Sequence, residues 1–369
     1  RVLLITREPI GRNMNAMGIR YFEFARWLSG HYDVTLIAPK NDSSFTYDGF
    51  SFFDYSPRNL IRAIRRADVI IVTNPHPLVI IAKTLFKKAV ILDLYDPLII
   101  DKLEKLAALP YPRRKIAYFV FWDWLKAQIR HSDYYLCSNE RQKDFYLGLL
   151  GAFRKLNPDT YSRDANGKGL ISIVATGVSD VPPVKEKKVL REVIPGLKVT
   201  DKILLWVGAP NKWFDEKLLI KAMKQLSGAR EDIKLVFMCG DAGKSELLRE
   251  NIRFCDSLGL TGKNVFFLDR WVPFEELADY YLEADVGLSL HRCHLETRYS
   301  MRNRILGYLW ARLPVIVTEG DTMADLVSQN GLGIVIKENH KENLISAILT
   351  MVDNSEFYGK CARAVEESI

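Results

Sequence analysis

Short, nearly uninterrupted runs of valine, isoleucine and leucine recur along the first half of the chain, with polar loops and helix-like stretches between them. Strands covered by helices on both faces have this continuous apolar pattern, whereas strands with one solvated face alternate. After the first run, a polar loop ending at Gly18 leads into a helical pattern over Ile19–Leu28. The pattern therefore predicts a parallel sheet interleaved with helices. Its strands are predicted over Arg1–Thr6, Asp33–Ala38, Asp68–Thr73, Ala89–Leu94, Tyr134–Cys137 and Leu170–Ala175.

A second series of the same kind follows a charged, proline-containing stretch, Pro182–Asp201. Two such series, joined by a linker near residue 190, predict an α/β protein with two doubly wound domains, and ligands in such folds bind at the carboxyl ends of the strands, here in a cleft between the domains. We predict domains over residues 1–190 and 191–355, then a C-terminal helix over 356–369 that could pack on the first domain. The second series has strands predicted over Ile203–Val207, Lys234–Met238, Val265–Leu268, Val286–Leu290, Val315–Thr318 and Gly333–Ile336, with helices such as Glu216–Leu226 and Phe274–Ala284.

Composition and charge narrow the class of protein. The 369 residues are 48% hydrophobic and 26% charged, and no apolar run approaches the roughly 20 residues of a membrane-spanning helix. The five cysteines are scattered and no signal-peptide pattern is present, so we expect a cytoplasmic protein. The net charge of +7 comes without a long basic tract or an aromatic RNA-binding signature. Phosphorylated ligands and a membrane surface therefore fit the charge better than nucleic acid.

Arginines gather around one glutamate in the stretch His294–Val315, at the start of a predicted helix that leads into a buried strand. Helix N-termini and guanidinium groups both bind anions, and diphosphate is the usual anion at such a place. The stretch therefore predicts a diphosphate site. Its charged members are Glu296, Arg298, Arg302, Arg304 and Arg312.

Two loops of the first domain carry candidate chemistry. The loop Gly11–Gly18 joins the first strand to the first helix, and its glycines and asparagines, Asn15 among them, suit a phosphate; a plain connection is the alternative. The stretch Leu92–Pro97 ends a buried strand with Asp93 and Asp96, which could accept hydrogen bonds from sugar hydroxyls or take up a proton. Helix capping followed by a proline turn is the alternative there.

Two loops of the second domain follow strand ends. In Gly208–Asp215, Gly208 allows close backbone approach, Lys212 could meet a phosphate and Trp213 could face a sugar, unless these are a surface lysine and a core tryptophan. In Phe267–Val272, Arg270 or Trp271 could flank a nucleobase, with a tryptophan packed between domains as the alternative. Nearby, His291, Cys293 and His294 lack a fourth metal ligand, so we predict no metal site.

The stretch Tyr111–Arg130 mixes basic and aromatic residues over a helical length. A helix of this composition can lie on an anionic membrane, or it can simply pack on its own domain. The sequence leaves both interpretations open.

The order of these motifs resembles the large fourth family of retaining glycosyltransferases, which has the GT-B fold of two facing Rossmann-like domains. The resemblance covers almost the whole chain. It is carried by LLWVGAPNKW, VFMCGDAGKSELL, NVFFLDRWVPFEELADYYLEADVGLSL, LPVIVTEGD and NGLGIVI in that order. A branch from bacterial polysaccharide gene clusters is more similar still, because Trp213, Asp215 and the segment from His294 to Pro314 fit its pattern.

The chain departs from the family at several positions. Family members usually carry two glutamates eight positions apart, and counting back from Pro314 places Gly307 and Tyr299 there. The second of these carboxylates commonly binds the donor ribose, so this contact is missing at Gly307. The family's usual Arg and Lys after the Gly208 loop align with Ala209 and Phe214.

The resemblance implies transfer of a sugar from a nucleoside diphosphate with retention at the anomeric carbon, without a metal or another cofactor. It implies Glu296 for the sugar hydroxyls, Lys212 and Arg304 for phosphate, and a glycan or lipid-linked glycan as acceptor, at the inner membrane surface. Two alternatives are a sugar-nucleotide 2-epimerase of the same fold and a binding protein that has lost catalysis, for which Gly307 is the argument. The first-domain residues implied for the acceptor or the reacting sugar are Asn15, Gly18, Asp93 and Asp96.

Overall fold

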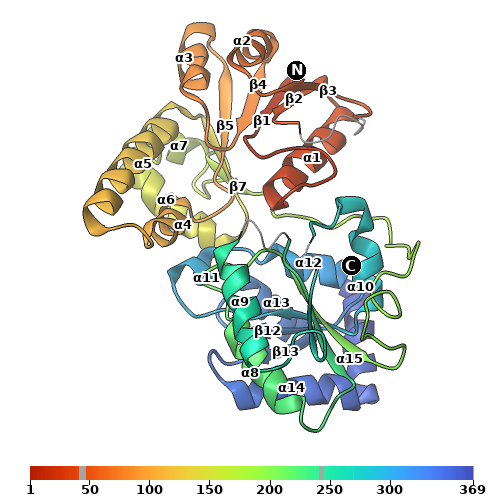
Figure 1. The fold of residues 1–369 in the computed structure, drawn as a ribbon. Coiled ribbons are helices and arrows are strands. Elements are labelled where there is room, and N and C mark those ends of the chain that lie inside the picture. Colours follow the sequence, from red (N-terminus) through yellow and green to blue (C-terminus); the bar gives the residue numbers. More distant parts are fainter. Residues whose placement is uncertain (41–46, 241–244, 269, 369) are drawn as a thin grey trace. The chain divides into compact units, whose positions relative to one another are not determined.

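The computed structural model describes residues 1–40, 47–240, 245–268 and 270–368, and the chain forms two compact units, Arg1–Thr176 and Gly177–Ile369 (Figure 1). Each unit has its own parallel sheet, so the predicted architecture is confirmed. Pro182–Asp201, which we predicted as a linker, belongs to the second unit.

The first unit contains a seven-stranded sheet in the order β3-β2-β1-β4-β5-β6-β7, in which every pairing is parallel. Side chains from α2 and α3 bury one part of the sheet, and side chains from α5 and α6 bury another. Its strands are β1 Val2–Ile5, β2 Val34–Ala38, β3 Ser51–Asp54, β4 Val69–Val72, β5 Ala89–Asp93, β6 Tyr134–Cys137 and β7 Ile171–Ile173. Its helices are α1 Ala16–Ser29, α2 Pro57–Arg66, α3 Pro77–Phe86, α4 Leu98–Leu106, α5 Tyr111–His131, α6 Glu140–Ala152 and α7 Pro158–Arg163.

The second unit contains a six-stranded parallel sheet in the order β10-β9-β8-β11-β12-β13. Its strands are β8 Lys202–Val207, β9 Ile233–Met238, β10 Val265–Phe267, β11 Val286–Ser289, β12 Val315–Thr318 and β13 Gly333–Ile336. Its helices are α8 Glu216–Leu226, α9 Glu246–Ser257, the 3-10 turn η2 Phe274–Glu276, α10 Leu277–Glu283, α11 Leu295–Tyr299, α12 Asn303–Trp310, α13 Thr322–Asn330, α14 Lys341–Asp353 and α15 Ser355–Ser368.

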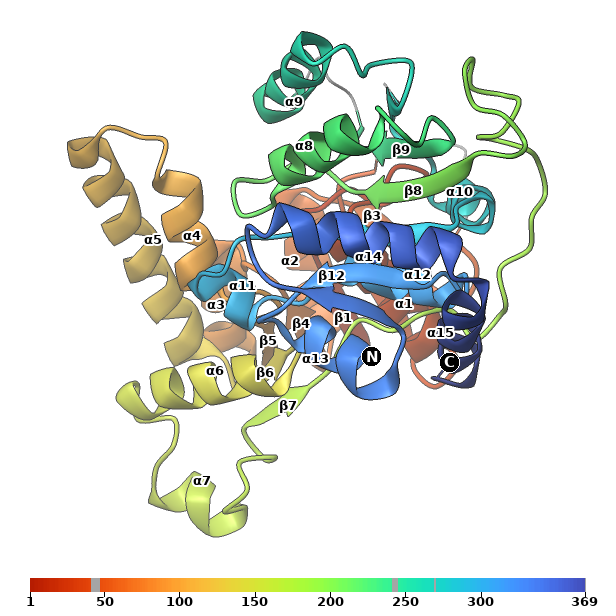
Figure 2. The same cartoon turned by 90° about the horizontal axis from the view of Figure 1, so that it is seen from below.

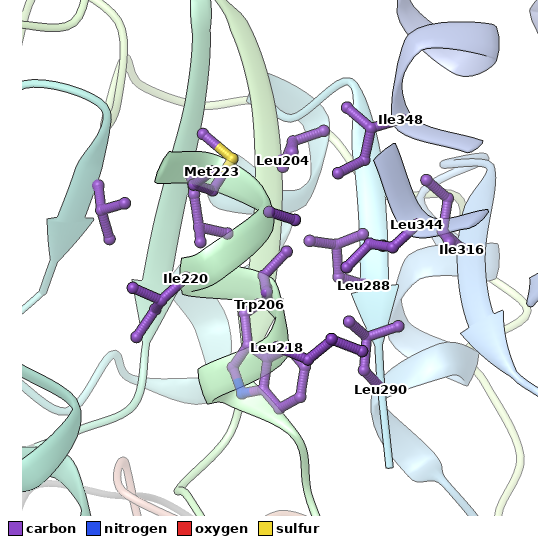
Figure 3. Close-up of a cluster of buried hydrophobic side chains, with 14 of the residues drawn as sticks. Leu204, Trp206, Leu218, Ile220, Met223, Leu288, Leu290, Ile316, Leu344 and Ile348 are labelled. Carbon is purple, nitrogen blue, oxygen red and sulfur yellow. The ribbon is translucent and has the colours of Figure 1, made fainter. Parts of the chain in front are cut away.

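Both faces of this second sheet are buried, which explains the continuous apolar runs. Successive side chains of a strand point to opposite faces. Leu204 and Trp206 of β8 therefore pack with α8, α9 and α14 (Figure 3), whereas Ile203 and Leu205 pack with α10, α12 and α13. Every strand of this sheet ends at the same edge, and the loops that carry the candidate residues follow those ends.

The stretch after residue 182 is attached to α10 by two buried carboxylates. Asp279 accepts hydrogen bonds from the backbone N–H groups of residues 186 and 187, at 2.7 and 3.1 Å, and Glu283 accepts from those of residues 189, 190 and 191. Val189, Leu190 and Leu197 are buried in the same core. These contacts place the division of the chain at residue 176, ahead of the predicted boundary at residue 190.

The C-terminal helix α15 also packs on the second unit. The side chain of Cys361 is buried in the core on one face of the sheet, and that of Val365 is buried in the core on the other. Arg312 forms an ion pair of 3.0 Å with Glu366 of this helix. None of the helices in the described part of the chain combines the length and the apolar character that a membrane-spanning segment requires.

Candidate functional site

Arg304 has the most unusual surroundings among the candidate residues of the second unit. It lies in the first turn of α12, and its guanidinium carbon is 3.9 Å from the ring centre of Phe214 and 4.5 Å from that of Trp206. Its Nη1 is buried without a hydrogen-bond partner, and no described carboxylate lies within ion-pair distance. Burial lowers the pKa of Arg304, although a guanidinium stays charged at neutral pH. The aromatic rings thus hold a positive charge that forms no direct ion pair with a described carboxylate.

Gly208 brings the backbone close to this guanidinium. Its φ of +101° is a left-handed conformation that favours glycine, and a Cβ added there would lie 3.4 Å from Nη2 of Arg304. The end of β8 and the start of α12 therefore meet at Arg304, as a diphosphate site requires.

Glu216 is a further member of this site that the sequence analysis did not identify. It is the first residue of α8, is 5% exposed, and has an Oε1 without a hydrogen-bond partner. Burial raises the pKa of Glu216 to about 7, although the positive charge of Arg304 opposes the rise. The sequence gives no signal for this role, because Glu216 directly follows the helix-capping Asp215, where an acidic residue is common.

Glu296 and Arg302, both predicted to touch the donor, form a buried ion pair with each other. The Arg302 Nη1 and Nη2 donate to the two carboxylate oxygens of Glu296 at 3.1 and 2.7 Å, and the Ser300 hydroxyl donates to Oε1 at 2.6 Å. Both charged side chains are about 95% buried, at 4% and 5% exposure. The pair fixes the loop between α11 and α12, and the carboxylate oxygens keep further lone pairs for a ligand hydroxyl.

Asp321 lies next to both Arg302 and His291. The His291 Nδ1 is 3.6 Å from the Asp321 Oδ2, and the same carboxylate oxygen is 3.6 Å from the Arg302 Nε. Burial lowers the pKa of His291 to about 3, so the imidazole is neutral. Among the described residues, no group of three or more histidines, cysteines and carboxylates is placed to hold a metal ion.

The remaining charged candidates of this unit lie nearer the surface. Lys212 is exposed, and Arg298 is exposed with its guanidinium over the Tyr299 ring, 5.8 Å from its centre. Arg270 donates a hydrogen bond to the Tyr280 hydroxyl.

The two tryptophans predicted to meet the donor differ in exposure. Trp213 packs in the core beside Phe214, which agrees with the alternative of a core tryptophan. Trp271 is 43% exposed and lies on Gly240, where an added Cβ would be 3.2 Å from its ring. Trp271 therefore leaves an aromatic surface beside the end of β9.

In the first unit, two residues toward the C-terminal end of the stretch Gly11–Gly18 have structural roles at the start of α1. The Asn15 side chain caps α1 by accepting a hydrogen bond of 2.9 Å from the Gly18 N–H. A Cβ on Gly18 would lie 2.8 Å from the carbonyl oxygen of Pro9, so only glycine allows this approach.

The two carboxylates at the carboxyl end of β5, Asp93 and Asp96, have different surroundings. Asp93 is fully buried and accepts from Arg20 Nε and Nη2 at 2.9 and 3.1 Å, while Arg20 Nη1 donates to the Val174 carbonyl at 2.8 Å. Burial raises the pKa of Asp93, and Arg20 opposes the rise. Asp96 is half-buried, and its backbone carbonyl accepts from the Tyr146 hydroxyl. Asp93 thus serves an internal ion pair, and Asp96 remains the candidate for a ligand.

Comparison with known proteins bears on both units. Residues 201–354 match the family Glycosyl transferases group 1, and this range contains every candidate residue of the second unit. The fold is GT-B. No curated protein matches the sequence.

The similar solved structures are distant in sequence. The glycosyltransferase WaaG, involved in lipopolysaccharide biosynthesis, has 16% identity and a TM-score of 0.69, with 100% of this chain and 94% of that one covered. Anabaena HepE in complex with UDP and glucose has 13% identity and a TM-score of 0.68 over the same shares. Sucrose-phosphate synthase from Thermosynechococcus elongatus has 14% identity and a TM-score of 0.64, covering 99% and 93%. At these identities the similarity establishes the fold alone and does not assign a function to individual residues of this chain.

Proposed function

We propose that this chain is a glycosyltransferase that binds a nucleoside-diphosphate sugar at the carboxyl edge of its second sheet. The observation that carries the proposal is the Arg304 guanidinium, held on two aromatic rings against Gly208 without a carboxylate partner. A charge-assisted contact with a diphosphate would supply the missing counter-ion. The family match of the second unit and the complexes of HepE with UDP, glucose and UDP-glucose support the same ligand class.

The chemistry follows from the leaving group. When the bond between the sugar and the diphosphate breaks, negative charge grows on the diphosphate, and a fixed guanidinium stabilises that charge without a metal. We propose retention at the anomeric carbon, with the leaving phosphate taking the acceptor proton. Glu296, held in place by Arg302, would accept hydrogen bonds from the sugar hydroxyls.

The first unit would supply the acceptor side. Asp96 is the carboxylate there that we assign to the acceptor or the reacting sugar, and Asn15 and Gly18 shape the loop at the start of α1. Asp93 would act by fixing the strand end through Arg20. The involvement of WaaG in lipopolysaccharide biosynthesis supports a glycan or lipid-linked glycan acceptor.

The test is a donor panel of UDP-, GDP-, dTDP- and ADP-sugars, with hydrolysis and transfer followed by product analysis. We expect one base to be preferred, a metal chelator to leave the rate unchanged, and Arg304→Ala to remove the activity. Arg312→Ala is the matched control, because Arg312 is exposed and pairs with Glu366. Activity of Arg304→Ala within a few-fold of the parent, or a free epimerised sugar nucleotide as product, would overturn the proposal.

The alternative of a binding protein without catalysis rests on Gly307, which lacks the carboxylate of the family pattern. It predicts that one of the donors binds in a calorimetric titration and yet gives no product in the panel. Titration and product analysis together therefore separate the two functions.

We further propose that α5 attaches the first unit to an anionic membrane surface at the cytoplasmic face. Its C-terminal half packs inward through Leu125 and Ile129, whereas its N-terminal half exposes apolar side chains next to Arg113 and Lys115. Helices α4 and α5 lie side by side (Figure 2), and Leu103 of α4 is also exposed. Apolar groups flanked by cations match an anionic lipid surface. The exposed apolar residues of α5 are Tyr111, Ile116, Phe119 and Val120, at 70%, 67%, 50% and 65%.

Vesicle sedimentation tests this attachment. The parent should bind vesicles rich in phosphatidylglycerol and not vesicles of phosphatidylcholine. Both Ile116→Ser/Val120→Ser and Arg113→Glu/Lys115→Glu should lose binding, and Leu85→Ser, exposed on α3, should keep it. No binding by the parent, or equal binding to both vesicles, would refute the attachment.

A further inference from the structure

The space beside Gly307 is occupied by a tyrosine from another helix. A Cβ added to Gly307 would lie 2.8 Å from the hydroxyl oxygen of Tyr281 and 3.0 Å from its ring carbon Cζ. Tyr281 belongs to α10, which lies outside the segment that contains the family's two glutamates. A glutamate at position 307 and Tyr281 could not both fit without rearrangement. The phenol of Tyr281 therefore takes the volume in which the side chain of a family member would begin.

The hydroxyl of Tyr281 has unused hydrogen-bonding capacity. The side chain is 94% buried, at 6% exposure, yet its hydroxyl has no hydrogen-bond partner among the described residues. Burial raises the pKa of Tyr281, so the phenol is neutral and can both donate and accept. Arg304 acts on the same phenol, because its positive charge opposes that rise.

The neighbouring Tyr308 shows the opposite situation. Its ring meets that of Tyr281 edge to face, at 5.8 Å and 85°. Its hydroxyl accepts from the Val207 N–H at 2.9 Å and contacts the carbonyl oxygens of Leu205 and Leu288 at 3.0 and 3.2 Å. The Tyr308 hydroxyl thus makes its hydrogen bonds within the fold and joins α12 to two strands, whereas the Tyr281 hydroxyl makes none with the described residues.

Arg304 and Gly307 are three residues apart on α12, so they lie on one side of the helix, about one turn apart. A diphosphate bound at Arg304 carries its ribose within reach of the next turn. We propose that the Tyr281 hydroxyl binds a ribose hydroxyl of the donor, in place of the carboxylate that Gly307 lacks. The assignment rests on the proposed donor site. It also leaves the Arg304 guanidinium available to the diphosphate, because a neutral phenol does not form an ion pair with it as a carboxylate at position 307 could.

Calorimetric titration of Tyr281→Phe tests this contact, with the diphosphate of the preferred base, its 2′-deoxy and 3′-deoxy forms, and inorganic pyrophosphate as probes. Tyr281→Phe should weaken the ribonucleotide about fivefold to tenfold, the size of one hydrogen bond, and leave pyrophosphate unchanged. The parent should discriminate against one deoxy form, and the variant should not. Tyr280→Phe, one residue away with a hydroxyl bonded to Arg270, is the control that should keep this discrimination.

A Tyr281→Phe variant that keeps the parent's affinity and its ribose discrimination would overturn the assignment while leaving the diphosphate site intact. A parent that binds neither pyrophosphate nor any of UDP, GDP, dTDP and ADP would overturn the donor site and this contact together.

A second pair of variants tests the same contact and includes a check of folding. Gly307→Glu should lose nucleotide binding, because the new side chain would clash with Tyr281. The double variant Tyr281→Ala/Gly307→Glu should bind the nucleotide again. If the double variant is folded by circular dichroism and still does not bind, the idea that Tyr281 stands in for a carboxylate at position 307 is contradicted.

Discussion

Arg20 in the first unit and Arg304 in the second are both surrounded by aromatic rings at the carboxyl ends of strands, but only Arg20 has an anionic partner. Arg20 is held by both oxygens of Asp93 and lies over Phe24 and Tyr95. Arg304 lies over Trp206 and Phe214 and has no described carboxylate within ion-pair distance, although the carboxyl group of Glu216 acts on its charge from farther away. The difference separates a buried ion pair, which satisfies both of its charges within the fold, from a buried guanidinium without a direct ion pair, which we propose is available to an anionic ligand. Glu296 and Arg302 repeat the paired arrangement next to the unpaired one.

The largest effect is expected from breaking the paired arrangement. Asp93→Asn leaves the buried Arg20 without an anion, and the free energy of unfolding of the first unit should fall by about 3–5 kcal/mol. Chemical denaturation measures this loss. Glu23→Gln, which breaks the exposed pair with Arg26, should cost only about 0–1 kcal/mol. Equal effects of the two substitutions would show that burial does not distinguish these pairs.

A smaller effect concerns the unpaired arrangement and depends on pH. The pKa of Glu216 is about 7 in the folded chain and near 4.5 in the unfolded chain, so only the folded state keeps the proton between these values. Its contribution is fully present below pH 4.5 and is lost as pH rises to about 7, a change of about 3 kcal/mol in the free energy of unfolding.

His291, with a folded pKa of about 3, changes stability in the opposite sense below pH 6.5. The comparison must therefore be between the parent and Glu216→Gln, measured by denaturation from pH 4 to 8. The stability difference between them should change across this window. A constant difference would show that folding leaves the pKa of Glu216 unchanged.

The smallest effect should come from Gly208→Ala. Its φ of +101° disfavours any side chain, and the added Cβ would touch the Arg304 guanidinium at 3.4 Å. We expect a loss of about 1–2 kcal/mol in the free energy of unfolding, together with weaker pyrophosphate binding. Gly259→Ala, with φ of +69° and no atom within 4 Å of the new Cβ, controls for backbone strain alone. If both variants bind pyrophosphate equally well, Gly208 does not shape the anion site.

The sequence was sufficient to predict the sheets and much of the site's composition, because continuous apolar runs identify buried parallel strands and glycines or charges mark their ends. Arg304 and Gly208 could be identified in this way. The sequence could not show which charged residues form ion pairs with each other, because Arg20 and Asp93 are 73 residues apart and only the fold brings them together. Trp213 and Trp271 have similar sequence contexts, yet packing buries one and exposes the other. Tyr281 was hidden for the same reason, since its relation to Gly307 exists only in three dimensions.

The most direct test of the central claim, that Arg304 is an anion site left open by the fold, is calorimetric titration of Arg304→Ala and Arg312→Ala with inorganic pyrophosphate. Arg304→Ala should weaken binding by about a hundredfold or more, as expected for a buried charge-assisted contact. Arg312→Ala should stay within about twofold of the parent, because that arginine is an exposed partner of Glu366. Equal affinities of the two variants would contradict the account.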